Sequence, residues 1–123
     1  MIEGLHHIAI ICSSDRSLEF YKKLGFCEDS RRERPEHNDT LVWLKGFGVY
    51  LELFLYKEHP CRQINPEPYG LSHLAFCVND LDSIHYNLKD YNPGEVTIGH
   101  TGMRTCLVND PDGTTIELKE KKN

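Results

Sequence analysis

Two histidines and two glutamates stand at matching places in the two halves of the sequence. His7 precedes Glu52 by 45 residues, and His73 precedes Glu117 by 44 residues. Neutral imidazoles and carboxylates are ligands that divalent first-row metals accept, and four of them leave two open positions in an octahedral shell. The four residues therefore predict a centre for one divalent ion (Ni, Zn, Mn, Fe or Co) that binds and polarises a small oxygen-bearing substrate.

The setting of the two glutamates supports this prediction. Glu52 lies inside the apolar segment 49–55 and Glu117 inside 115–118. A charge in a buried strand is costly unless it is paired or bound to a cation. Taken singly, a strand histidine is more often a hydrogen-bonded core residue, and a strand glutamate often faces water. The recurrence of all four in register favours the metal site.

That register comes from an internal repeat. A shift of 66 residues aligns Leu5-His6-His7-Ile8-Ala9-Ile10 with Leu71-Ser72-His73-Leu74-Ala75-Phe76. Because His73 aligns with His7 and Ser72 with His6, His6 is predicted to point to the opposite face and not to bind the metal. The remaining histidines lack matching partners and are predicted in loops or on the surface: His37, His59, His85 and His100. Of these, His37 or His100 could line a cleft.

The elements that must position these residues follow the same repeat. Each half begins with a strand whose apolar residues on both faces indicate cover on both sides. A turn of N-cap residue types follows, at 13–15 and 79–80, and then a helix, at 15–24 and 81–89. Three shorter strands complete each half, at 26–32, 40–45 and 48–56 and at 96–100, 104–108 and 114–119.

The predicted fold class is therefore α+β, with two tandem βαβββ modules. We expect a single domain over residues 1–123, with module one at 1–56, a proline-containing linker at 57–69 and module two at 70–123. Gly25 stands where a left-handed residue would end the first helix.

Composition excludes several classes of protein. The formal net charge of −5 argues against a nucleic-acid partner, and no apolar run is long enough for a membrane span. No secretory signal is visible at the start, so we expect a cytoplasmic location. Five widely spaced cysteines are interpreted as reduced thiols, mostly buried.

The motifs together resemble the vicinal oxygen chelate superfamily, which includes glyoxalase I, fosfomycin-resistance transferases, extradiol dioxygenases and bleomycin-resistance proteins. The resemblance covers nearly the whole chain. It is carried by His7-Ile8-Ala9-Ile10, Phe20-Tyr21 with Leu24-Gly25-Phe26, Tyr50-Leu51-Glu52-Leu53-Phe54, Gly70-Leu71-Ser72-His73-Leu74-Ala75-Phe76, and Asn109-Asp110-Pro111-Asp112-Gly113 through Ile116-Glu117-Leu118.

The resemblance implies the glyoxalase/bleomycin-resistance fold, in which the modules curl as half-barrels around the metal. It implies the ligands His7, Glu52, His73 and Glu117, and a glyoxalase-like lyase or isomerase that acts on a hydroxy-carbonyl substrate through a metal-stabilised enediolate. One glutamate would move the proton; the analogy favours Glu117, with Glu52 as the alternative. Related proteins commonly dimerise, so we expect a homodimer, with each site in one chain or shared by two.

Two departures from the family leave the substrate open. Glutathione-dependent glyoxalases tend to carry an arginine and an asparagine where this chain has Ile11 and Tyr56. Three other residues could supply a different anion contact: Arg34, Asn38 and Arg104. The alternatives to an isomerase are a fosfomycin-type thiol transferase and a drug-binding protein without chemistry. An aromatic groove would suit the drug-binding alternative, and its candidate residues are Trp43, Phe47, Tyr50 and Tyr69.

Overall fold

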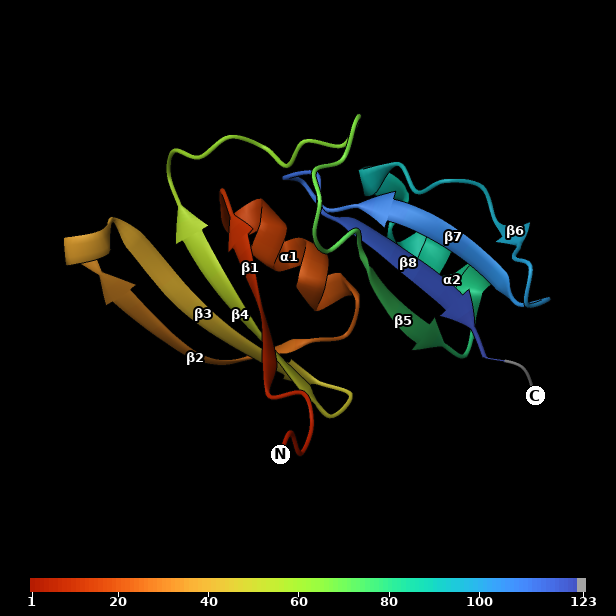
Figure 1. Ribbon diagram of the computed structural model, residues 1–123, viewed down its shortest axis with the longest axis horizontal. Helices are drawn as coiled ribbons and strands as arrows, with labels where there is room; N and C mark the ends of the chain where they lie inside the picture. The colour runs from red at the N-terminus through yellow and green to blue at the C-terminus, as the bar shows by residue number, and fades with distance from the viewer. Residues whose placement is uncertain (122–123) are drawn as a thin grey trace. The chain divides into compact units, whose positions relative to one another are not determined.

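The chain folds into two modules of the same connectivity (Figure 1). The computed structural model describes residues 1–121. Its contacts divide the chain into two compact units, one spanning residues 1–60 and the other beginning at Cys61. Neither helix in the described part of the chain is long and apolar enough to cross a membrane.

Module one is a four-stranded sheet with one helix. Its elements are β1 (His7–Cys12), α1 (Asp15–Lys23), β2 (Cys27–Arg34), the 3-10 turn η1 (Pro35–His37), β3 (Asp39–Gly46) and β4 (Val49–Tyr56). The strand order is β1-β4-β3-β2. β1 runs parallel to β4, and the other pairs are antiparallel.

Module two repeats this plan. Its elements are β5 (Leu74–Val78), α2 (Leu81–Asn87), the 3-10 turn η2 (Lys89–Tyr91), β6 (Thr97–Ile98), β7 (Arg104–Asn109) and β8 (Thr115–Glu120). The strand order β5-β8-β7-β6 matches that of module one, with β5 parallel to β8. The predicted α+β fold of two tandem βαβββ modules is confirmed.

Residues at the helix ends explain where both helices begin and where the first one ends. The Ser14 hydroxyl accepts from the backbone N–H of Arg16, and the Asp80 carboxylate accepts from that of Ser83. Gly25 has a φ of +111° and donates its N–H to the carbonyl of Lys22. An L side chain rarely adopts that φ, so glycine ends α1 as predicted.

One face of each sheet forms the core, because successive side chains of a strand point to opposite faces. In module one the buried apolar strand residues are Ile10, Cys12, Val42, Leu44, Leu51 and Leu53, and those of α1 include Leu18, Phe20 and Tyr21. In module two they are Cys106, Val108, Ile116 and Leu118. There α2 packs against β7 and β8 and buries Leu81.

The opposite face of each sheet is more open, which makes two predictions wrong. The first strands are not covered on both faces: Ile11 on β1 is 58% exposed, and Cys77 on β5 is also exposed. The cysteines are free thiols, but only Cys12 and Cys106 are buried. Residue type alone does not reveal strand phase, and Cys77 lies on the open face beside Ala75.

Candidate metal centre

His7 and Glu52 meet on the open face of module one. In the parallel register of β1 and β4, Ala9 lies opposite Glu52, and His7 stands two residues before Ala9 on the same face. Nε2 of His7 lies 3.6 Å from Oε1 of Glu52. The Glu52 side chain is 14% exposed and that of His7 33%, so both groups are partly covered but reachable from solvent.

Module two builds the same pair from the same register. Ala75 of β5 lies opposite Glu117 of β8, and His73 immediately precedes β5. Nε2 of His73 lies 3.5 Å from Oε1 of Glu117. The structure therefore brings together each predicted histidine and glutamate within its own module. That both pairs share one cation stays a prediction.

The donor geometry of each pair fits a metal better than a hydrogen bond. An N–H···O bond spans about 2.7–3.2 Å, and both pairs are longer, at 3.6 Å and 3.5 Å. Two ligands about 2.1 Å from one cation lie roughly 3.0 Å apart at a right angle and roughly 3.4 Å apart at the tetrahedral angle. Each pair could thus hold two corners of a coordination shell after a small side-chain movement.

The second ring nitrogen of each histidine has a partner of its own. Nδ1 of His7 lies 2.8 Å from Nδ1 of His6, and Nδ1 of His73 lies 3.0 Å from Oγ of Ser72. His6 is thus a contact of the predicted ligand, a role that sequence reasoning missed. The alignment of His6 with Ser72 was the available signal.

The two glutamates have different neighbours. Thr105 donates its hydroxyl to Oε2 of Glu117 at 3.1 Å, and Nζ of Lys119 lies 4.0 Å from the same oxygen. Glu52 instead has Trp43 as its direct cross-strand neighbour. The Trp43 ring also meets the ring of His7 edge-on, with 5.0 Å between centroids. One carboxylate is therefore held by polar groups, and the other stands beside an indole.

Arg34, one predicted anion contact, is bound within its own sheet. Its guanidinium donates two hydrogen bonds to the buried carboxylate of Asp39. The hydrogen bond from Arg34, with a smaller contribution from Tyr56, holds the pKa of Asp39 below its usual value against the effect of burial. The hydrogen bond to Asp39 raises the pKa of Tyr56. Asn38 forms the left-handed end of η1, with a φ of 56°.

Arg104 is bound on the opposite face of the module-two sheet. It pairs with Asp82 at 2.7 Å and with Glu120 at 3.1 Å. In strand alternation Arg104 shares the side of Cys106, whereas Thr105 shares the side of Glu117. Arg104 therefore supports the start of α2 and does not face Glu117.

The proposed aromatic groove is only partly assembled. Trp43 and Tyr50 lie on the face of Glu52, with ring centroids 6.1 Å apart. Phe47 occupies the β3–β4 turn and is 72% exposed, and Tyr69 in the linker is fully exposed. Of the other histidines, His37, His59 and His100 are exposed. His85 is half-buried, and its Nε2 lies 2.9 Å from the carbonyl oxygen of Gly94.

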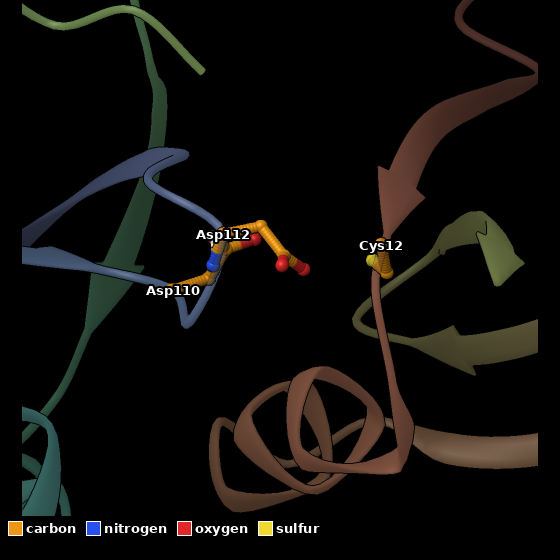
Figure 2. A group of neighbouring side chains, drawn as sticks. All are labelled: Cys12, Asp110 and Asp112. Atoms are coloured by element: carbon orange, nitrogen blue, oxygen red, sulfur yellow. Dashed lines mark hydrogen bonds between the residues drawn. The ribbon is translucent and has the colours of Figure 1, made fainter. Parts of the chain in front are cut away.

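A polar turn joins β7 to β8. Figure 2 shows Asp110 and Asp112 in the turn that joins β7 to β8, and Cys12 at the end of β1. Oδ1 of Asp110 accepts from the backbone N–H groups of Asp112 and Thr114, both at 2.9 Å. The carboxylate of Asp110 thus organises its own turn, as the Asp-Pro-Asp-Gly sequence predicts.

Comparison with known proteins assigns the family. Residues 4–118 match the model of the Glyoxalase/Bleomycin resistance protein/Dioxygenase superfamily. The chain belongs to this superfamily. It is 38% identical, over an alignment of 127 residues, to the uncharacterized protein YwkD of Bacillus subtilis, covering 98% of this chain and 99% of that one.

Solved structures agree with the family assignment. A glyoxalase family protein from Enterococcus faecalis superposes with a TM-score of 0.86 at 32% identity, covering 97% of this chain and 98% of that chain. The trypanothione-dependent glyoxalase I of Leishmania major superposes with a TM-score of 0.75 at 26% identity, covering 97% of this chain and 87% of that chain.

Proposed function

We propose that this protein is a divalent-metal-dependent, glyoxalase-like lyase or isomerase that acts on a small hydroxy-carbonyl substrate. The observation that carries the proposal is the repeated pair: each module holds a histidine Nε2 and a glutamate Oε1 about one ligand spacing apart, at 3.6 Å and 3.5 Å. The likeness to a glyoxalase I adds support, since that relative has the same fold at 26% identity.

In the proposed mechanism the ligands are His7, Glu52, His73 and Glu117. When bound, the divalent cation would supply Lewis acidity towards two substrate oxygens. A carboxylate on the open face would then take a proton from the carbon beside the carbonyl and return it to the neighbouring carbon. We assign this proton transfer to Glu117, as the family resemblance favours, with Glu52 as the alternative.

The substrate is proposed to be something other than a glutathione adduct. Ile11 and Tyr56 occupy the two positions where glutathione-dependent relatives tend to carry polar contacts. The Ile11 side chain offers no hydrogen bond, and Tyr56 is engaged with Asp39. A compact hydroxy-carbonyl compound needs neither contact.

Metal analysis is the first experiment. Protein purified without chelator should hold close to one divalent ion per proposed site, and both Glu52→Gln and Glu117→Gln should lower that content. The matched control is Glu19→Gln, an exposed acid on α1 whose side chain is 60% exposed. Metal content unchanged in all three variants would remove the basis of the proposal and favour a drug-binding protein.

Proton exchange is the second experiment. Metal-loaded wild type in D₂O should exchange the C–H protons of hydroxyacetone, followed by NMR, or isomerise the thiohemiacetal of methylglyoxal. Glu117→Gln should lose this exchange even when metal is restored in excess, because an amide cannot accept the proton. If Glu52→Gln alone loses exchange, the roles of the two glutamates are reversed.

We also propose a homodimer. Light scattering gives the mass in solution. Mixing His7→Ala with His73→Ala then tests sharing: if one site takes ligands from two chains, the mixture regains metal that each variant lacks. No regain in a dimer would place each site within one chain.

A further inference from the structure

The residue before each proposed ligand makes the same contact in both modules. His6 lies against Nδ1 of His7 at 2.8 Å, and Ser72 lies against Nδ1 of His73 at 3.0 Å. In both modules the other ring nitrogen, Nε2, is the one nearer the glutamate. The contact thus recurs at repeat-equivalent positions although the two side chains differ in chemistry.

The proton on a neutral imidazole decides which nitrogen can bind a cation. A neutral ring carries one N–H, and only the other nitrogen has a lone pair to offer. A partner that accepts a hydrogen bond from Nδ1–H therefore leaves Nε2 free to act as the ligand. The hydroxyl oxygen of Ser72 can accept such a bond, and so can the unprotonated Nδ1 of a neutral His6.

We propose that His6 and Ser72 are positioning residues that fix His7 and His73 as Nδ1–H tautomers, with Nε2 directed at the metal. The inference rests on the proposed metal site but does not follow from it, since the ligands could function with water at Nδ1. Partners of this kind typically contribute about 10–100-fold to metal affinity.

The two positions should also be interchangeable. Because an imidazole and a hydroxyl serve the same purpose in the two modules, His6→Ser would copy module two into module one. This separates positioning from direct ligation. If His6 were itself a metal ligand, a serine in its place would not restore binding.

The test is Zn²⁺ affinity measured by competition with a chromophoric chelator. We expect His6→Ala and Ser72→Ala each to weaken binding about tenfold, and His6→Ser to stay within a few-fold of wild type. The matched control is His59→Ala, which removes an exposed histidine that contacts the Tyr56 ring instead. The melting temperatures of the metal-free variants and wild type should be alike, which would exclude a general loss of folding.

A spectroscopic readout addresses the tautomer directly. In Zn²⁺-loaded protein, ¹⁵N-edited NMR should show slowly exchanging Nδ1 protons on His7 and His73. His6→Ala should abolish the His7 signal and leave that of His73.

The outcomes distinguish a failure of the positioning role from a failure of the proposed metal site. Wild-type affinity in His6→Ala and Ser72→Ala, with loss in His7→Ala, overturns the inference and leaves the proposed function standing. Equal losses in His6→Ser and His6→Ala also overturn it. Wild-type affinity in both His7→Ala and His73→Ala defeats the proposed function itself.

Discussion

The hydroxyl of Thr105 donates a hydrogen bond to Oε2 of Glu117 over 3.1 Å, and module one has no hydroxyl at the equivalent place. Thr105 pairs in register with Lys119, two residues after Glu117. In module one Leu41 pairs with Phe54, two residues after Glu52. The two proposed carboxylate ligands are therefore supported unequally.

This inequality predicts the effect of Thr105→Val, which keeps the shape of the side chain and removes the donor. Metal affinity should fall about tenfold, because Glu117 loses the contact that orients it. Stability should fall by only about 1 kcal/mol, since the partly exposed carboxylate can bind water instead. Calorimetric titration with Zn²⁺ measures the first quantity and urea unfolding the second. Thr97→Val on the exposed strand β6 is the control, and an equal loss there would count against the assignment.

Trp43 should report metal binding at His7 by fluorescence. It is the single tryptophan of the chain, and its ring centroid lies 5.0 Å from that of His7. An open-shell ion such as Ni²⁺ quenches an indole at short range. Titration with Ni²⁺ should therefore quench the emission of wild type in a saturable way, whereas His7→Ala should need at least tenfold more metal. Saturable quenching that is unaffected in His7→Ala would place the metal elsewhere.

The ion pair between Arg34 and the buried Asp39 predicts a pH dependence of stability. The hydrogen bond from Arg34 holds the pKa of Asp39 below its usual value. The resulting stabilisation is fully present at pH values above the unfolded-state pKa of an aspartate, about 3.9. It is lost as the pH falls towards the lower pKa of Asp39 in the folded state. Asp39→Asn should be less stable at neutral pH, and the gap to wild type should close on acidification below about pH 4.

Urea unfolding at a series of pH values measures this gap. The control is Asp29→Asn, whose side chain is 37% exposed and pairs with Lys45 at 3.3 Å. A difference between wild type and Asp39→Asn that stays constant down to acid pH would contradict the assigned cause.

The sequence predicted the fold well because the repeat supplies each assignment twice. His7 and His73 locate the first strands, and Gly25 marks the end of α1. The errors arose where the burial of a residue was predicted from its type alone, or where a strand's length was predicted without knowing its pairing partner. Cys77 is a type that is usually buried, but it lies on the open face. The predicted strand 96–100 is only Thr97–Ile98, because β6 pairs only along that short stretch with β7.

The candidate site likewise has a part that the sequence predicts and a part that it does not. The His–Glu pairs could be predicted because equal spacing in a repeat implies equal register. The supporting contacts could not, since they depend on which residues lie opposite each other across strands. Thr105 and Glu117 are twelve residues apart and meet diagonally. Arg104, one residue earlier, points to the other face, and no feature of the sequence separates the two without the register.

That difference in face gives a prediction for Arg104. Its guanidinium binds Asp82 and Glu120, and the Glu120 carboxylate also accepts the backbone N–H of Leu81 at the start of α2, at 2.9 Å. Arg104→Met should therefore loosen the attachment of α2 and lower the melting temperature by about 2–4 °C. Metal affinity and hydroxyacetone exchange should stay at wild-type levels, because Glu117 lies on the other side of the sheet.

Thermal unfolding followed by circular dichroism measures the first effect, and chelator competition the second. Arg31→Met is the matched control, since within residues 1–121 this arginine forms its ion pair with Glu28, a neighbour on the exposed strand β2. It should leave the melting temperature within about 1 °C of wild type. If Arg104→Met kept its melting temperature but lost the exchange reaction, Arg104 would be a substrate contact after all, and the assignment of sheet faces in module two would have to be reversed.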